Sequence, residues 1–542
     1  MHPVAVAGCM LLLLALPREG WAQLRDSITA DAVLRHMHVL AHDSLEGRGT
    51  ATRGERWAAA YIRDRLAAAG VSPALPGNEW LQWMPMHASR PDASATIDIT
   101  FAETVVRLAV QRDVVLYESG AETFIPQSLP LVFVGYGIVA PEYDYNDYQD
   151  LDVRNAIVVM LSGEPPSQDS TYFAGARTTV HALPAWKQRI ALSRGARGSM
   201  IITLPRDATT SWEERCAAFA FEHVTPASTP PATLSAEIAW EFAPLLFHDS
   251  PYEFDEVLTM DSTSRMRSFA LACGASYRAG ARTRDARAAN VVGVIEGADP
   301  MRHAEVLLLA AHYDALGMQS GAADSIWNGA VDNAIGTAVL IEIARALAAD
   351  PPPRSVVVLF TTGEEKGLLG AQWYTARPAR PLHRTIAAIN IDGVSIFDRV
   401  RAFTGIGADL STLGDRLSDV LHARGLHRAD VASLFDAEES FMRSDQFAFA
   451  QAGIPSMLVM ESLDYESLTP AEGRARYLAW MRDVYHAPGD DMLQPFSHAA
   501  ITQHASLLLA LARHLANAAE PPRWHAGVPY QQARLRSQAE GR

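Results

Sequence analysis

Apolar side chains recur every three to four residues in two segments near the N-terminus, 29–45 and 52–69. This spacing places them on one face of a helix. Gly70 follows the second segment in the position of a helix C-cap. The stretch 43–50 between them contains two glycines, which predicts a turn joining two helices.

The pattern changes between residues 92 and 284. Short runs rich in β-branched residues at 105–110, 114–116, 131–136 and 156–161 alternate with Pro, Gly, Asn and Asp, as strands and turns do. One amphipathic helix is expected near 185–195. We therefore predict a β-rich inserted domain over 92–284.

From residue 288 onward, strand and helix patterns alternate. Strands are expected at 290–295, 306–311, 355–362, 387–391 and 456–460, and helices at 335–349, 368–376 and 501–518. Nearly continuous apolar strands alternating with helices predict an α/β fold, a mostly parallel sheet sandwiched by helices. The core is expected to combine 23–91 with 285–520, and the polar tail 521–542 to fray.

The first residues have the pattern of an export signal. An apolar run at 4–16 precedes Gly20-Trp21-Ala22, which predicts a signal peptide over 1–22 and a periplasmic or extracellular protein. The run is too short to cross a bilayer, so no permanent membrane span is expected. A lipoprotein-like box at 6–9 leaves lipid anchoring as a minor alternative.

Length, cysteines and charge limit the remaining possibilities. At 542 residues the chain exceeds one ordinary core, and its 20% charged residues are typical of globular proteins. A net charge of −16 without a basic stripe argues against a nucleic-acid partner. Beyond the signal, Cys216 and Cys273 could pair or be buried, and they lack the spacing of a thiolate zinc site.

Histidines and carboxylates gather where strands end or helices begin. Taken singly, each has an ordinary explanation: Asp332 could cap a helix, for example. Their coincidence at five such places indicates a site, because buried carboxylates are costly unless paired or bound to metal. A set of two histidines and three carboxylates suits borderline divalent ions such as zinc, and leaves manganese and cobalt open. The candidates are His312, Asp314, Asp332, Glu364, Glu365, Asp392, His486 and Asp490.

The order of these motifs resembles the co-catalytic di-zinc aminopeptidase family, which includes bacterial leucyl aminopeptidases and, more distantly, glutamate carboxypeptidase II and the transferrin receptor. The pattern is His-x-Asp, Asp-Asn before a helix, Glu-Glu-x-Gly-x-x-Gly, Asp after a strand, and Tyr-His. Residues 444–446 and 453–455 match a further family block. The stretch 132–137 resembles a protease-associated domain.

The resemblance implies a metallo-aminopeptidase that removes N-terminal residues from peptides by means of a hydroxide bridged by two zinc ions. Asp332 would bridge the ions, His312 and Asp392 would complete one site, and Glu365 and His486 the other. Glu364 would be the general base, and Tyr485 would donate a hydrogen bond to the oxyanion. Asp314 and Asp490 would orient His312 and His486, respectively.

Two departures from the family, Ala315 and Gln446, stand at positions that are not metal ligands in the family, and they leave the substrate preference open. The alternatives are a glutaminyl-cyclase-type aminoacyl cyclotransferase and a carboxypeptidase or dipeptidase. The latter calls for an arginine clamp, for which Arg443 is the candidate near a motif. A receptor-like scaffold would have lost metal ligands, all of which this chain keeps. Oligomeric state and the preferred N-terminal residue stay open.

Overall fold

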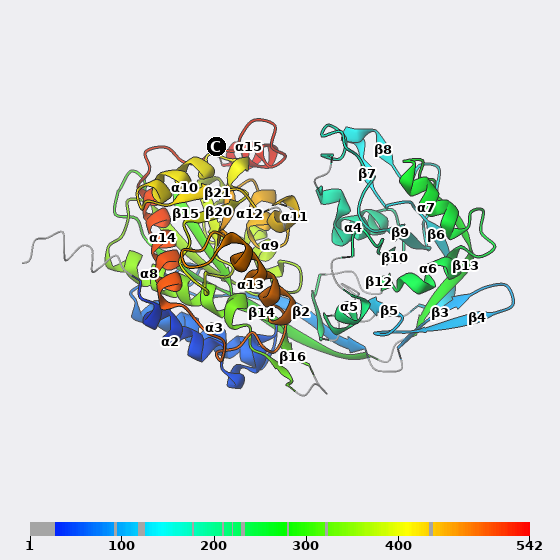
Figure 1. The fold of residues 1–542 in the computed structure, drawn as a ribbon, viewed down its shortest axis with the longest axis horizontal. Coiled ribbons are helices and arrows are strands. Elements are labelled where there is room, and N and C mark those ends of the chain that lie inside the picture. The colour runs from blue at the N-terminus through cyan, green and yellow to red at the C-terminus, as the bar shows by residue number, and fades with distance from the viewer. Residues whose placement is uncertain are drawn as a thin grey trace, which may run out of the picture.

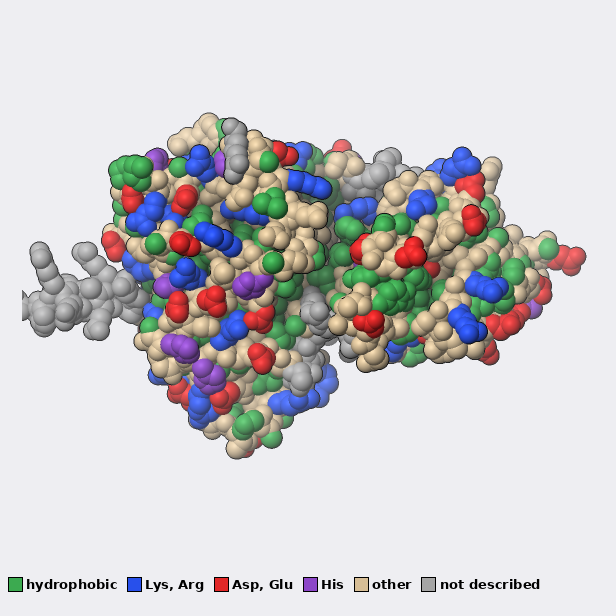
Figure 2. All heavy atoms as spheres, turned by 90° about the horizontal axis from the view of Figure 1, so that it is seen from above, with side chains coloured by type: hydrophobic (Ala, Val, Ile, Leu, Met, Phe, Trp, Pro, Cys, Tyr) green, Lys and Arg blue, Asp and Glu red, His purple; other side chains and the backbone are tan. Residues whose placement is uncertain are grey.

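The computed structural model describes residues 28–541 except 92–94, 117–124, 176–177, 209–210, 219–220, 229–233, 279–280, 320–323 and 433–436. The chain forms two lobes, each built on its own sheet (Figure 1). A furrow separates the lobes on the face drawn in Figure 2, where acidic and basic side chains are interspersed. The predicted signal peptide lies outside the described residues.

The first lobe contains a ten-stranded mixed sheet. Its middle strands run parallel, as predicted, and antiparallel strands extend it on both sides. Across the sheet the order is β11 (His223–Pro226), β2 (Leu81–Pro91), β14 (Ala281–Ile295), β18 (Ser355–Thr361), β15 (Val306–His312), β19 (Thr385–Asn390), β22 (Ser456–Glu461), β20 (Ala402–Ile406) and β21 (His427–Ala429), with β1 (Ser72–Pro73) pairing with β14.

Helices cover both faces of this sheet. In β15, Leu307 and Leu309 pack into one cluster while Leu308 and Ala310 pack into another. Successive side chains of a strand point to opposite faces, so an all-apolar strand buries both. One face is covered by α2 (Ala30–Leu40), α3 (Arg53–Ala68), α8 (Ile335–Ala349), α10 (Leu413–His422) and α14 (His498–Asn517); the other by α9 (Leu369–Ala376) and α12 (Gln446–Gln451).

Among the described residues, the second lobe contains an eight-stranded sheet and four short α-helices. The strand order is β4 (Val105–Ala109), β3 (Thr96–Thr100), β13 (Phe269–Arg278), β6 (Ile125–Phe133), β9 (Ile157–Leu161), β10 (Gly198–Ile202), β12 (Leu234–Ile238) and β5 (Val114–Leu116). The helices are α4 (Pro184–Ser193), α5 (Trp212–Ala218), α6 (Ala243–Phe247) and α7 (Phe254–Ser262). A small hairpin pairs β7 (Val139–Ala140) with β8 (Tyr145–Asn146).

The two lobes are connected by more strand pairing than the sequence pattern predicts. Strands β2 and β14 pair along their length from Leu81↔Val291 to Pro91↔Ala281, so one antiparallel ribbon runs from the first sheet toward the second lobe (Figure 1). Strand β11, from the middle of the expected insertion, pairs with β2 and extends the first sheet. Its short run of His, Val, Thr and Pro carried no clear strand pattern.

The early helices are shorter than the predicted segments. Thr29 and Thr52 cap α2 and α3 by accepting hydrogen bonds from Ala32 N and Glu55 N, as N-cap residues do. The first helix ends at Leu40, and a 3₁₀ stretch (Asp43–Arg48) makes the glycine-rich turn. None of the described helices is both long and apolar enough to cross a bilayer.

The C-terminal tail does not fray as predicted. Trp524 is buried, and its Nε1 donates a hydrogen bond of 2.9 Å to Gly453 O. Helix α15 (Gln531–Glu540) follows, and Tyr530 before it packs against the same cluster as Trp524. Because the tail is mostly polar, these few apolar side chains gave no recognisable pattern in the sequence.

The two cysteines considered for a disulfide are both free. Cys216 lies on α5 and is partly exposed, whereas Cys273 is buried in β13. The thiol of Cys273 donates a hydrogen bond of 3.4 Å to Leu246 O.

We expect a substitution of His504 to change the acid sensitivity of the first lobe. Burial lowers the pKa of His504 to about 4, while its Nδ1 accepts a hydrogen bond from Ser395 N. Between pH 6.5 and 4 the unfolded chain binds a proton that the folded protein does not, so stability falls as pH falls. This loss is about 2 kcal/mol at pH 5.

In His504→Gln, which keeps an acceptor for Ser395 N, the acid-induced loss between pH 7.5 and 5 should be smaller by about that amount. Urea unfolding at both pH values measures it. An unchanged loss in the variant would contradict the assignment of a neutral buried imidazole.

We also expect Trp524→Ala to destabilise the first lobe by about 3–5 kcal/mol, because it leaves a cavity and an unpaired Gly453 carbonyl. Trp57→Ala is the matched control, since Trp57 is 47% exposed on α3, and should change stability by about 0.5 kcal/mol or less. Equal effects in urea unfolding would mean that the tail is not packed in solution.

Candidate metal centre

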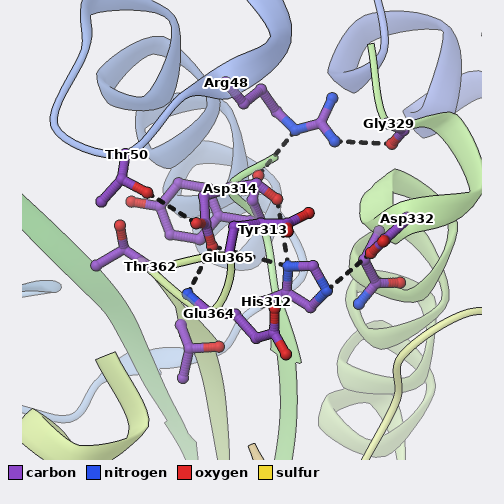
Figure 3. A network of polar contacts seen from close by, with 12 residues as sticks. Arg48, Thr50, His312, Tyr313, Asp314, Gly329, Asp332, Thr362, Glu364 and Glu365 are labelled. Carbon is purple, nitrogen blue, oxygen red and sulfur yellow. Dashed lines mark hydrogen bonds and ion pairs between the residues drawn. The ribbon is translucent and has the colours of Figure 1, made fainter. Parts of the chain in front are cut away.

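The carboxyl ends of the central strands meet at one edge of the first sheet. His312 ends β15 beside Thr361, the last residue of β18, and Asn390 ends β19 opposite Ala310. Because these strands are parallel and end at the same edge of the sheet, the segments that follow them lie together. This edge gathers the predicted candidates His312, Asp314, Asp332, Glu364, Glu365, Asp392, His486 and Asp490 (Figure 3 shows five of them).

Six of these side chains form two groups that could each hold a metal ion. Within each group, one ligand atom per residue lies within 4.8 Å of the others. Glu364, expected to be a base rather than a ligand, lies in the first group. The groups are His312, Glu364 and Asp392, and Asp332, Glu365 and His486.

Asp332 connects the two groups. Its Oδ1 lies 3.2 Å from His312 Nε2, and its Oδ2 lies 3.0 Å from His486 Nε2. His486 Nε2 is also 3.4 Å from Glu365 Oε2, and His312 Nε2 is 3.1 Å from Asp392 Oδ1. Two ligands that each lie 2.0–2.1 Å from a tetrahedral zinc are about 3.3 Å apart. The donor atoms therefore fit zinc in type and in spacing.

The second group lines a small cavity. Its volume is about 10 Å³, and Asp332, Glu365 and His486 form part of its wall. This is room for one water-sized species. Trp327 of β17 (Ile326–Trp327), which pairs with β16 (Gly317–Met318), lines the same cavity.

The loop that carries Asp332 is held by two neighbouring side chains. The carboxylate of Asp490 accepts hydrogen bonds from Val331 N (2.9 Å) and Asp332 N (3.0 Å). This differs from the expected role of Asp490 beside the imidazole of His486. Asn333 takes the capping position instead of Asp332, because its Oδ1 accepts a hydrogen bond from Gly336 N.

Asp314 lies behind His312, where it was predicted. Its Oδ1 is 3.7 Å from His312 Nδ1, and its backbone oxygen is 3.2 Å from the same nitrogen. The carboxylate also accepts hydrogen bonds from Thr50 Oγ1 (2.9 Å) and Glu364 N (3.3 Å). Asp314 thus connects the imidazole to the loop that carries both glutamates (Figure 3).

Arg48 is a buried cation behind the site that motif reasoning missed. Its guanidinium donates hydrogen bonds to the carbonyls of Tyr313 (2.8 Å) and Gly329 (2.8 Å), which flank His312 and Asp332 (Figure 3). Further bonds reach the carbonyls of Leu40 and Asn328. The glycine-rich turn that contains Arg48 was the available signal, but it indicated only a bend.

Asp392 is fixed by a chain of polar side chains. Its Oδ2 accepts a hydrogen bond of 2.5 Å from Ser444 Oγ, and Ser444 Oγ accepts one of 2.8 Å from Asn390 Nδ2. Asn390 Nδ2 also donates to Gln446 Oε1. The glutamine that departs from the family pattern therefore supports the segment leading to Asp392.

Tyr485 lies flat against a candidate ligand. Its ring stacks on the imidazole of His486 with centroids 3.9 Å apart and an interplanar angle of 18°. Its other neighbouring ring is that of Trp480 on α13 (Pro470–Asp483), with centroids 5.8 Å apart. Burial, together with the carboxylate of Asp332, raises the pKa of Tyr485 well above its ordinary value.

The protonation of the site reflects carboxylate crowding. Burial and the neighbouring Asp332 raise the pKa of Glu365 to about 7, despite the opposing effect of His486. Burial would lower the pKa of His486, but Glu365 and Asp332 raise it to about 9. Burial also raises the pKa of Glu364 well above its ordinary value. These shifts indicate a site that requires additional positive charge when all its carboxylates are ionised.

Comparison with known proteins is consistent with this geometry. Residues 290–512 match peptidase family M28, and this range contains both groups of candidate ligands. Aminopeptidase YwaD of Bacillus subtilis is 29% identical over 106 residues, which are 19% of this chain and 21% of that protein. A protein of Leptosphaeria maculans named "Probable zinc metalloprotease" is 30% identical over 119 residues, 22% of this chain and 26% of that protein.

These matches thus span about a quarter or less of the curated relatives. A solved structure, an aminopeptidase from Aneurinibacillus sp. strain AM-1, superposes with a TM-score of 0.54 at 17% identity. The superposition covers 92% of this chain and 97% of the other. The two proteins therefore share a fold.

We expect Asp490→Asn to weaken metal binding although Asp490 belongs to neither ligand group. The substitution places an amide where Val331 N and Asp332 N need an acceptor, so the Asp332 loop should lose its position. Loss of such support typically lowers metal affinity by about 10- to 100-fold.

Asp491→Asn is the matched control, because the Asp491 carboxylate accepts a hydrogen bond from Leu493 N at the surface. Competition with a chelator measures zinc affinity in both variants. Equal affinities would show that Asp490 does not position Asp332.

Proposed function

We propose that this chain, whose residues 290–512 match peptidase family M28, is a zinc-dependent aminopeptidase that holds two zinc ions and removes N-terminal residues from peptides. The observation that supports this most directly is the bridging arrangement of Asp332. Its two carboxylate oxygens face different histidines, each with further carboxylates around it. A site that holds zinc between such ligands suits hydrolysis of an amide bond, since zinc polarises a carbonyl and lowers the pKa of bound water to about 7.

The protein side chains would then move protons and hold ligands. Glu364 takes a proton from the attacking water and delivers it to the nitrogen of the departing amine as the C–N bond breaks. General acid–base catalysis of this kind contributes about 10²–10⁴ in rate. Asp314 keeps the imidazole of His312 in place, and Arg48 holds the loops that carry His312 and Asp332.

Tyr485 is proposed to stabilise the negative charge that develops on the carbonyl oxygen. Its ring stacks on His486, which places it beside the second ligand group. A phenol with a raised pKa stays protonated at neutral pH and can donate a hydrogen bond to an oxyanion. This role follows from its position and from the resemblance of the Tyr485-His486 pair to the family motif.

Export and a covering role for the second lobe complete the proposal. The apolar run before residue 22 supports secretion to the periplasm or outside the cell, with lipid anchoring as the minor alternative. The second lobe is proposed to be a protease-associated-type domain that borders the furrow between the lobes. Its Val180 and Leu183 pack against the same cluster as Leu368, three residues after Glu365.

A panel of aminoacyl-p-nitroanilides, each with its N-acetylated form, tests this function. We expect cleavage of the free forms only, loss of activity with a chelator, and recovery with zinc. In Glu364→Gln, kcat should fall by about 10²–10⁴ while bound zinc is retained. Glu213→Gln, at an exposed position, is the matched control and should behave as the wild type.

Cleavage of acetylated substrates would contradict the aminopeptidase assignment. If two zinc ions are bound but no substrate is cleaved, the cyclotransferase and carboxypeptidase activities become the ones to assay. Full activity in Glu364→Gln would remove Glu364 as the base.

A further inference from the structure

Lysine is almost absent from this chain, and one of its lysines stands at the metal centre. Among 46 basic residues only Lys187 and Lys366 are lysines. Lys187 is fully buried in the second lobe, where its Nζ donates a hydrogen bond of 2.9 Å to Leu161 O. Lys366 directly follows Glu365 and is partly exposed.

The ammonium of Lys366 forms no ion pair with a carboxylate of the described residues. Within the described part of the chain, no carboxylate lies within ion-pair distance of its Nζ, in contrast to arginines of this lobe such as Arg53, Arg284 and Arg354. Its close neighbour is the ring of Phe221, whose centroid is 5.6 Å from Nζ. A cation over an aromatic face is held in place by the ring but keeps its charge available to a ligand.

Phe221 links this ammonium to the wall of the metal cavity. Its ring meets that of Trp327 edge to face, with centroids 4.9 Å apart at 86°. Trp327 in turn lines the cavity bounded by Asp332, Glu365 and His486. Lys366, Phe221 and Trp327 therefore form one continuous row of side-chain contacts beside the second ligand group, which we term the lysine wall.

The inserted segment supplies Phe221, and its return to the first sheet holds the ring in this place. The residues that follow Phe221 form β11, which pairs with β2 in the first sheet. The neighbouring Glu222 forms a two-pronged ion pair with Arg284 of β14. The lysine wall thus combines the inserted segment with the peptidase core and is anchored on the ribbon of β2 and β14.

We infer that the lysine wall binds a carboxylate on the residue that follows the scissile bond, so that the enzyme prefers substrates carrying a negative charge there. This inference rests on the proposed function. A substrate α-ammonium would be repelled by Lys366, whereas a carboxylate is attracted to it. The amino end of the peptide therefore lies away from Lys366, toward His312 and Asp392, and the leaving residue lies against the lysine wall.

The carboxylate can come from two sources. In a dipeptide it is the C-terminal carboxylate, and in a longer peptide it is the side chain of an acidic second residue. Two substrate pairs distinguish them: Leu-Gly against Leu-Gly-amide, and Leu-Glu-amide against Leu-Gln-amide. Within each pair the substrates differ mainly by one negative charge.

The wild-type enzyme should show a kcat/KM about tenfold higher for the charged member of at least one pair, as expected for one charge-assisted contact. In Lys366→Met, which keeps the apolar stem, this ratio should fall to about one, and Lys366→Arg should restore most of it. Arg65→Met is the matched control, because it removes a cation 5.4 Å from the ring of Tyr61 on the far helix α3. It should leave the ratio as in the wild type.

Two outcomes of this assay would overturn the inference. One is a wild-type ratio near one in both pairs. The other is a ratio that survives in Lys366→Met but is lost in Arg443→Gln, which would make Arg443, the exposed arginine near Tyr485 and His486, the carboxylate clamp.

A binding measurement separates this inference from the proposed function. Reductive methylation with ¹³C-formaldehyde labels the two lysines and the α-amine and keeps their charge. The NMR signal that disappears in Lys366→Met is then assigned to Lys366. N-acetylglycine should shift this signal, and N-acetylglycinamide should not. A shift without any peptide hydrolysis would retain the carboxylate site and reject the aminopeptidase; equal responses to both probes would reject the carboxylate site.

Discussion

Carboxylate crowding at the end of the central strands is the constraint on which this structure depends. Asp314, Asp332, Glu364, Glu365 and Asp392 lie together at this edge, where burial and neighbouring carboxylates raise the pKa of Glu364 and Glu365. Folding can concentrate such charges only if cations balance them. In the metal-free protein His312 and His486 supply part of this charge, because their pKa values are raised. Zinc ions would supply it instead when bound, since zinc binds the neutral imidazole.

Arg48 supplies positive charge from behind the site. Burial lowers its pKa only to about 10, because the carboxylates of Asp490 and Asp314 oppose that shift. It is therefore a permanent cation at neutral pH. Its hydrogen bonds go to backbone carbonyls rather than to carboxylates, so it neutralises the site at a distance while fixing the loops. The N-terminal turn, far away in sequence, is thus part of the centre.

The strand-and-helix core could be read from the sequence because its signals are local and repeated. Predicted strands such as 306–311 and 355–362 match β15 and β18 within a residue. The strand-end rule then brought His312, Asp332 and Asp392 to one edge, as the structure places them. Their roles in binding metal stay predictions. The capping role considered for Asp332 belongs instead to Asn333, a choice that depends on tertiary contacts.

Features that depend on contacts between residues far apart in the chain could not be predicted from the sequence. Neither the burial of Arg48 nor the pairing of β11 with β2 produces a periodic pattern of apolar residues in the sequence, because each is stabilised by residues far along the chain. Trp524 was hidden in a polar tail because one aromatic side chain makes no pattern. Asp490 was assigned to the wrong neighbour for a similar reason: nearness in sequence to His486 outweighed a contact with Val331 that only folding creates.

The ribbon of β2 and β14 also sets the order in which the protein can be assembled during synthesis. Strand β2 ends at residue 91 and its partner β14 begins at residue 281, so about 190 residues separate them. At about 5–20 residues per second, the ribosome needs roughly 10–40 s to cross that interval. Through this delay the apolar faces of α2 and α3 have no sheet to cover. The nascent N-terminal segment must therefore be shielded until the strands on which it packs have been translated.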